Sequence, residues 1–281
     1  MTKRAGIIGW PVSHSLSPVL HGYWLKEYGI DGEYLRLPVQ PEGFVAGVDR
    51  ARKEGFAGLN VTVPHKEAAC KLAATRDKAA EMSGAVNLLV FGDNAIAGRN
   101  TDYLGLRKSL EENLGENALK DKTVILLGAG GAARAAILAL DEMGVAQIHI
   151  LNRHQARAEG LSHDLALKVK ARLVPGALIN WASVAQTADL LVNTTSAGMS
   201  GNAPLELDLA PLPAAAAVCD VVYSPLETQL LKDAAKRGHR VIDGLGMLMH
   251  QASPSFEAFF GVEPKVTPGL RAVLESALHG R

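Results

Sequence analysis

Two polar segments in the first third of the chain carry the side chains best suited to acid–base chemistry. Asn60-Val61-Thr62-Val63-Pro64-His65-Lys66 ends an apolar, strand-like run with polar groups and a lysine. Because the pKa of a lysine responds to burial and to neighbouring charges, Lys66 in a dry cleft is suited to proton transfer. Asn100-Thr101-Asp102 supplies a carboxylate at a predicted hinge, where Asp102 can face the same cleft. The alternatives are a solvated surface lysine and an aspartate that caps the following helix.

A third polar segment, Ser13-His14-Ser15-Leu16-Ser17-Pro18, lies between a predicted strand and a helix that opens at Pro18. Closely spaced hydroxyls beside a helix N-terminus can bind a carboxylate without a basic residue. Ordinary N-capping serines are the alternative. His14, His21 and His65 do not have the spacing of a zinc site, and we predict no metal.

A glycine-rich turn, Gly128-Ala129-Gly130-Gly131-Ala132-Ala133, follows an apolar strand pattern and opens a helix pattern. In this context Gly128 permits the tight turn and Gly130 lets the backbone approach a pyrophosphate, while the small Ala133 lets helix and strand pack closely. The helix N-terminus supplies N–H groups for the anion. The alternative is a glycine-rich turn without a ligand, and we favour a dinucleotide cofactor.

The residues after the second strand of this region indicate which dinucleotide binds. An NAD site places an acidic residue there for the ribose 2′-hydroxyl. Here the strand ends in Asn152-Arg153, and Arg157 follows one helical turn later. Guanidinium groups bind a 2′-phosphate that a carboxylate would repel. Solvated arginines are the alternative, but cations are unfavourable at a helix start, so we predict NADP.

The elements that must position these groups form two predicted α/β domains. We expect residues 1–103 to form the substrate-binding and catalytic domain, completed by C-terminal helices in 247–281, and residues 104–246 to form a Rossmann-like, doubly wound, NADP-binding domain. A cleft between two domains is a usual place for a small-molecule site. The predicted strands are 4–9, 33–37, 57–61, 86–91, 95–99, 123–127, 147–151, 190–193 and 218–222. The predicted helices begin near Pro18 and Pro41 or span 104–113, 131–143, 154–170, 227–237, 247–260 and 269–278.

Composition excludes several classes of protein. The chain has 281 residues, 48% of them hydrophobic, which suffices for a packed core. Lys plus Arg and Asp plus Glu both number 29, so a general nucleic-acid binder is disfavoured. Cys70 and Cys219 read as small buried side chains and not as a disulfide framework. With no leader-like apolar region in residues 1–10 and no membrane-length apolar run, we expect a soluble, cytoplasmic protein.

Taken together, the polar motifs resemble those of the shikimate dehydrogenase family along essentially the whole chain. The match comprises Ser15-Leu16-Ser17-Pro18, Asn60 to Lys66, Gly84-Ala85-Val86-Asn87, Asn100-Thr101-Asp102, the glycine turn, Asn152-Arg153, Asn193-Thr194-Thr195-Ser196-Ala197-Gly198-Met199, Asp243-Gly244-Leu245-Gly246-Met247-Leu248 and Gln251. The resemblance implies an oxidoreductase that reduces 3-dehydroshikimate to shikimate with NADPH, in the chorismate and aromatic amino-acid pathway.

The resemblance also implies a role for each matching residue. Lys66 and Asp102 would form the catalytic pair, and Ser15 and Ser17 would hold the substrate carboxylate with Tyr223 close to it. The groups for the ring hydroxyls would be Asn60, Thr62, Asn87, Asp102 and Gln251. The cofactor-binding residues would be Gly128, Ala129, Gly130, Gly131, Ala132, Ala133, Asn152, Arg153, His154, Arg157, Thr194, Thr195, Ser196, Val221 and Gly244.

Three departures from the family pattern accompany the match. Tyr103 stands where the family usually has glycine at the hinge, and His154 stands where a threonine is familiar. A minor departure is His65, where an apolar or aromatic residue is also common. One alternative function is a quinate/shikimate dehydrogenase that uses NAD, and another is a non-catalytic NADP-binding paralogue. The predicted partner is a small-molecule substrate, without nucleic acid or membrane, and a homodimer is one alternative for the oligomeric state.

Overall fold

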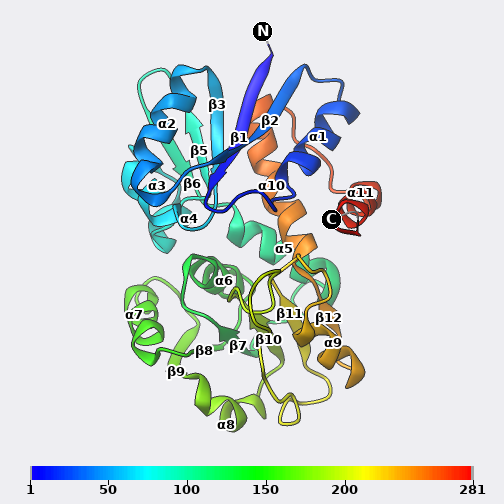
Figure 1. Ribbon diagram of the computed structural model, residues 1–281. Helices are drawn as coiled ribbons and strands as arrows, with labels where there is room; N and C mark the ends of the chain where they lie inside the picture. Colours follow the sequence, from blue (N-terminus) through cyan, green and yellow to red (C-terminus); the bar gives the residue numbers. More distant parts are fainter. Residues whose placement is uncertain (1, 280–281) are drawn as a thin grey trace. The chain divides into compact units, whose positions relative to one another are not determined.

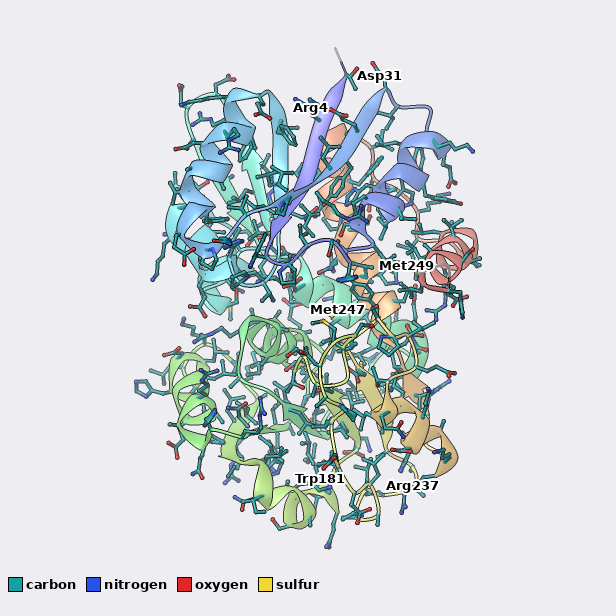
Figure 2. The ribbon with its side chains drawn as sticks, viewed as in Figure 1. Arg4, Asp31, Trp181, Arg237, Met247 and Met249 are labelled. Carbon is teal, nitrogen blue, oxygen red and sulfur yellow. The ribbon has the colours of Figure 1, made fainter. Side chains whose placement is uncertain are left out.

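The computed structural model describes residues 2–279 of the chain, which divides into two compact units. The first unit is Met1–Asp102 with Met249–Arg281, and the second unit is Tyr103–Leu248. The sequence predicted the first division after residue 103, one residue later than in the structure, and the second after residue 246, two residues earlier. Residues 1 and 280–281 of the predicted first domain lie outside the described residues. Met247 and Met249, labelled in Figure 2, flank the second division, which falls within helix α10 (Gly244–Phe260).

The first unit contains a mixed sheet in the order β2-β1-β3-β5-β6-β4. Its strands are β1 (Lys3–Gly9), β2 (Gly32–Pro38), β3 (Phe56–Val61), β4 (Thr75–Arg76), β5 (Leu88–Phe91) and β6 (Ile96–Arg99). β1 runs parallel to both β2 and β3, whereas β5 runs antiparallel to β3 and β6. The predicted hairpin is therefore confirmed, with its turn between Phe91 and Ile96.

Helices cover both faces of this sheet, as Figure 1 shows for α2 and α3 on one side and α1 and α10 on the other. The helices of the first unit are α1 (Ser17–Glu27), α2 (Phe44–Lys53), α3 (Lys66–Leu72), α4 (Lys78–Ser83), the second half of α10, and α11 (Pro268–His279), with a 3₁₀ turn at Pro41–Gly43. Phe44 and Val48 of α2 pack on Ile8 and Leu59 of the sheet. Leu59 points to this face of β3, so the next residue, Asn60, points to the opposite face, toward Tyr34 and toward Ser255 of α10.

The second unit is a doubly wound parallel sheet in the order β12-β11-β10-β7-β8-β9. Its strands are β7 (Thr123–Leu127), β8 (Gln147–Asn152), β9 (Arg172–Ala177), β10 (Leu190–Asn193), β11 (Ala217–Asp220) and β12 (Val241–Ile242). The chain starts in the centre at β7, winds outward to β9, and returns to β10 beside β7. This confirms the predicted fold class, and its switch point lies between β7 and β10, where such sheets bind ligands.

Two apolar layers hold the helices of the second unit on opposite faces of its sheet. One layer joins α5 (Asp102–Leu114), α6 (Gly131–Glu142) and α7 (Gln155–Leu165), and the half-buried ring of Tyr103 packs against it. The other joins α8 (Trp181–Ala185) and α9 (Gln229–Lys236). Trp181, labelled in Figure 2, donates from Nε1 to the Asp208 carbonyl at 2.7 Å. The bulky Tyr103 is thus accommodated as a half-buried side chain that packs against the first of these layers.

Several elements differ from those the sequence predicted. β9 was not predicted because Pro175 interrupts its pattern, and the strand tolerates proline because it lies at the edge of the sheet. α9 begins two residues later than predicted, since Thr228 caps it by accepting from the Leu231 N–H. α7 ends at Leu165, five residues early. Among the described helices, none is long and apolar enough to cross a membrane.

Candidate active site

Lys66 and Asp102 form an ion pair in the first unit. Lys66 is the first residue of α3, just after β3, and its Nζ lies 2.5 Å from Oδ2 of Asp102. The Asp102 side chain is only 2% exposed and that of Lys66 is 19% exposed. A carboxylate so deeply buried needs a charged or hydrogen-bonding partner. The alternative of a solvated surface lysine is therefore wrong.

Asn87 engages the second oxygen of the same carboxylate. Its Nδ2 donates to Asp102 Oδ1 at 2.7 Å, and its Oδ1 accepts from the Thr101 backbone N–H at 2.8 Å. Because only Oδ1 can accept from that N–H, the Asn87 amide is held with its donor toward Asp102. The Asp102 backbone N–H donates to Asn100 Oδ1 at 3.0 Å. The carboxylate is thus oriented from both sides and does not act as a helix cap.

Gln251 joins this group from α10. The Asn87 Nδ2 lies 3.5 Å from Gln251 Oε1, and the Thr101 hydroxyl donates to the Gln251 carbonyl at 2.9 Å. The C-terminal segment of the first unit therefore lies beside the predicted catalytic pair, as we expected from the matching motifs, which include Gln251. Thr101 was part of a quoted motif but was not assigned to the site, although its backbone and hydroxyl both hold the neighbouring groups.

Asn60 emerges half-buried from β3 with its amide in a separate set of hydrogen bonds. Tyr34 donates from its hydroxyl to Asn60 Oδ1 at 2.7 Å, while Asn60 Nδ2 donates to Ser255 Oγ at 2.8 Å and to the Asn87 carbonyl at 3.2 Å. Tyr34 and Ser255 were not identified from the sequence. Tyr34 looked like an ordinary strand residue, and Ser255 has no motif around it.

The two serines of the predicted carboxylate site face one another. Ser15 Oγ lies 3.2 Å from Ser17 Oγ and also accepts from the Ser17 backbone N–H at 3.2 Å. Leu16 is the N-cap of α1, and no side chain caps this helix. The N-capping alternative is therefore wrong. Arg36, which the sequence did not single out, donates to the Ser15 carbonyl at 2.7 Å and holds this turn against β2.

Two further residues of the strand-end motif have distinct surroundings. Thr62 is half-buried, and its backbone N–H donates to the Ile8 carbonyl at 3.0 Å. His65 is buried, stacks on Phe44 at 4.8 Å between ring centroids, and bonds through Nε2 to the Val39 carbonyl at 2.8 Å. His65 thus anchors the segment before Lys66, whereas the binding role of Thr62 stays a prediction.

The glycine turn in the second unit has the geometry that a dinucleotide pyrophosphate requires. Gly128 has φ +110°, and a Cβ there would lie 2.8 Å from Thr194 Oγ1, so only glycine fits. Gly130 is the N-cap of α6, no side chain caps the helix, and its first turn holds no acidic residue. The N–H groups of that turn lack intrahelical acceptors. Ala129, Gly131 and Ala132 are half-buried and Ala133 is fully buried against the core.

The end of β8 presents two arginines and a histidine to solvent. Arg153, His154 and Arg157 are exposed, and no ion pair of either arginine occurs within residues 2–279. Asn152 is half-buried and donates from Nδ2 to the His154 carbonyl at 2.9 Å, which shapes the turn. Uncompensated guanidinium groups beside the glycine turn fit a 2′-phosphate.

A buried network shapes the loop after β10. Asn193 Oδ1 accepts from both the backbone N–H and the hydroxyl of Thr195, at 3.1 and 2.7 Å, and Asn193 Nδ2 donates to Asp220 Oδ1 at 3.0 Å. Thr228 donates to the other Asp220 oxygen at 2.7 Å. Burial raises the pKa of Asp220, against the lowering effect of these hydrogen bonds. Asn193 and Asp220 were not assigned to the site from sequence, yet they fix the predicted cofactor loop.

The other predicted cofactor residues lie on the same edge of the sheet. Thr194 donates from Oγ1 to the Leu127 carbonyl at 2.6 Å, beside the glycine turn, and Ser196 is exposed. Gly244 begins α10, and a Cβ there would lie 2.2 Å from the half-buried Val221 carbonyl, so this contact requires glycine. Tyr223 follows β11 in the second unit and is half-buried. Within the described chain, no cluster of three His, Cys, Asp or Glu side chains could hold a metal ion.

Comparisons with known proteins match both units. Residues 7–89 match the family described as "Shikimate dehydrogenase substrate binding domain", and residues 109–200 match "Shikimate / quinate 5-dehydrogenase". The shikimate dehydrogenase (NADP(+)) of Paramagnetospirillum magneticum is 47% identical over 278 residues, which cover 98% of each chain.

Two solved structures resemble the whole chain. The Thermus thermophilus shikimate 5-dehydrogenase, in complex with NADP(H) and shikimate, has a TM-score of 0.85 and 32% identity over 99% of each chain. The Corynebacterium glutamicum quinate dehydrogenase, in complex with NAD, has a TM-score of 0.87 and 31% identity over 99% of each chain. With these matches along almost the full length, the chain belongs to the shikimate dehydrogenase family.

Proposed function

We propose that the protein catalyses the reversible, NADP-dependent reduction of 3-dehydroshikimate to shikimate. The observation that carries this proposal is the ion pair between Lys66 and the buried Asp102, held by Asn87 in the unit that matches the substrate-binding domain. A lost activity would leave no reason to keep a lysine and a carboxylate paired below the surface. The non-catalytic paralogue is therefore disfavoured.

In this proposal, different residues of the first unit bind different groups of the substrate. Ser15 and Ser17 bind the carboxylate, since two hydroxyls 3.2 Å apart match the two oxygens of such a group. The ring hydroxyls are taken by Asn60, Thr62, Asn87, Asp102 and Gln251. Tyr223 of the second unit is proposed to lie near the carboxylate. A site built of hydroxyl and amide groups suits a substrate that carries several hydroxyls.

Lys66 handles the proton in this reaction. NADP supplies or accepts the hydride when it is bound. As the substrate carbonyl is reduced, negative charge develops on its oxygen, and the Lys66 ammonium stabilises that charge and donates a proton from Nζ. In the oxidative direction the neutral amine accepts the proton from the hydroxyl. Asp102 holds Lys66 Nζ in place and accepts a hydrogen bond from a neighbouring substrate hydroxyl.

The second unit holds the cofactor in this proposal. Backbone N–H groups of Gly130, Gly131 and Ala132 meet the pyrophosphate at the start of α6. Arg153 and Arg157 bind the 2′-phosphate, with His154 beside them, while Thr194, Thr195, Ser196, Val221 and Gly244 line the same edge. An NAD-dependent quinate/shikimate dehydrogenase is the second candidate, because the Corynebacterium glutamicum quinate dehydrogenase has the same fold. The arginines at the end of β8 favour NADP.

We further propose that the enzyme works in the cytoplasm, as two free cysteines suit a reducing compartment. A homodimer stays a prediction.

Absorbance at 340 nm tests the function directly. The purified protein is given shikimate or quinate, each with NADP+ or NAD+. We expect the fastest increase with shikimate and NADP+. Faster reaction with quinate and NAD+ would support the second candidate, and no reaction in any of the four mixtures would overturn the proposal.

A further inference from the structure

The hydrogen-bonding capacity of the Asn60 amide is almost fully used within the first unit. An asparagine amide has two N–H donors and an oxygen with two lone pairs. Nδ2 donates to Ser255 Oγ at 2.8 Å and to the Asn87 carbonyl at 3.2 Å, so both N–H groups have acceptors. Oδ1 accepts from the Tyr34 hydroxyl at 2.7 Å. The second lone pair on Oδ1 is therefore the one hydrogen-bonding position of the Asn60 amide that these contacts leave unused.

The orientation of this amide follows from its neighbours. The Asn87 main-chain oxygen can only accept, so the Asn60 atom that faces it is nitrogen and not oxygen. The other amide atom, 2.7 Å from the Tyr34 hydroxyl, is then an acceptor, and the tyrosine must donate. A flipped amide would place oxygen against oxygen at Asn87, whereas the Tyr34 and Ser255 hydroxyls could each bond to either amide atom, so the Asn87 carbonyl decides the orientation.

Tyr34 itself is held rigidly. Its ring stacks on His21 with 4.0 Å between centroids and 4° between planes, and it also contacts Phe259. Tyr34 is buried, as is Ser255. A buried, stacked ring has little rotational freedom, so its hydroxyl stays directed at Asn60.

We propose that Tyr34 is a positioning residue that fixes Asn60 as a hydrogen-bond acceptor toward the substrate. The substrate atom at Asn60 must then be a donor, which a hydroxyl is and a keto oxygen is not. Asn60 therefore holds a ring hydroxyl that is present in both substrate and product, and does not hold the oxygen that is reduced. This inference rests on the proposed function and makes Asn60 a determinant of specificity for hydroxylated rings.

The experiment uses Tyr34→Phe, which removes the hydroxyl and keeps the stacked ring. Tyr28→Phe is the matched control, because the Tyr28 hydroxyl accepts from the Lys265 N–H and not from the site. For Tyr34→Phe we expect KM for shikimate to rise about 2- to 12-fold, as for a lost neutral hydrogen bond. We expect kcat and KM for NADP+ to change little, since this hydrogen bond stabilises the bound substrate and the transition state equally. Tyr28→Phe should have the same kcat and KM values as the parent.

Two tests separate positioning from a general structural effect. In Asn60→Ala, adding Tyr34→Phe should raise KM no further, because the tyrosine acts through the amide. With shikimate analogues that each lack one ring hydroxyl, the analogue lacking the hydroxyl that meets Asn60 should lose its sensitivity to Tyr34→Phe, while the others keep it.

The outcomes distinguish this inference from the proposed function. If the parent enzyme does not oxidise shikimate, both the proposed function and this inference are wrong. An active parent with an unchanged KM in Tyr34→Phe, or with an equal rise for every analogue, overturns the inference alone.

Discussion

Asn87 donates from Nδ2 to Oδ1 of Asp102 at 2.7 Å, on the opposite side of the carboxylate from Lys66. The two oxygens of Asp102 therefore have different partners, one neutral and one charged. This arrangement fixes the orientation of the Asp102 carboxylate and places Lys66 Nζ against one of its oxygens.

Arg153 should determine the preference for NADP. Arg153→Ala removes a charged hydrogen bond worth about 1.5–3 kcal/mol, so affinity for NADP+ should fall roughly 10- to 150-fold. Affinity for NAD+ should hardly change, because it has no 2′-phosphate. Fluorescence titration of both cofactors measures these affinities.

Arg237→Ala is the matched control for this charge. Arg237 is exposed and lies between α9 and β12, at the opposite end of the parallel strands from the glycine turn. If Arg153→Ala lowered the affinities for NADP+ and NAD+ equally, Arg153 would have a structural role and would not select the cofactor.

The serine pair should govern substrate binding alone. Ser17→Ala removes one hydroxyl of the Ser15–Ser17 pair, and KM for shikimate should rise roughly 10- to 150-fold, as for a lost hydrogen bond to a charged group. The Michaelis constant for NADP+ should stay that of the parent. Changing both serines should be worse than either change, but less than additive in free energy, because they share one ligand. Unaltered KM values in both single variants would refute the assignment.

The sequence indicated the side chains of the candidate site better than the residues that hold them in place. Lys66, Asp102 and the glycine turn could be found because reactive side chains and steric demands leave recognisable local patterns. Tyr34, Ser255 and Arg36 act through contacts between segments far apart in the chain, for which a single sequence has no signal. Short elements such as α3 are similarly invisible, because seven residues are too few to show a helical period.

Buried polar groups were the other feature that pattern alone did not predict. His21 reads as a helix residue, yet it is fully buried among Trp24, Tyr34, Phe256 and Phe259. Neither of its ring nitrogens has a hydrogen-bond partner among the described residues. Burial lowers the pKa of His21 to about 3.

This buried ring should make stability depend on pH. The unfolded chain takes up a proton at His21 near pH 6.5, whereas the folded protein resists it down to about pH 3. Stability from this source is complete above pH 6.5 and is lost as the pH falls from 6.5 toward 3. Between pH 7 and pH 5 the loss should be roughly 2 kcal/mol in the free energy of unfolding.

His21→Phe should remove that dependence while it keeps an aromatic ring against Tyr34. Urea unfolding at pH 7 and pH 5 measures the difference for parent and variant. The same loss of stability in both proteins would mean that His21 does not resist protonation in the fold.

The catalytic pair allows a further check by double substitution. Asp102→Asn should impair both turnover and substrate affinity, because the carboxylate supports Lys66 and also accepts from a ring hydroxyl. Combining it with Lys66→Met should cost far less than the product of the separate losses, as expected for groups that act together. Fully multiplicative losses in kcat would show that the two residues act independently.

The turnover number of Lys66→Met with shikimate and NADP+ tests the proposed mechanism most directly. The variant should bind NADP+ like the parent, because the glycine turn belongs to the second unit, and circular dichroism verifies that it is folded. We expect kcat to fall by about 10²–10⁴-fold, the usual contribution of general acid–base catalysis. A folded Lys66→Met variant with the turnover of the parent would contradict the mechanism and leave Lys66 as a binding residue.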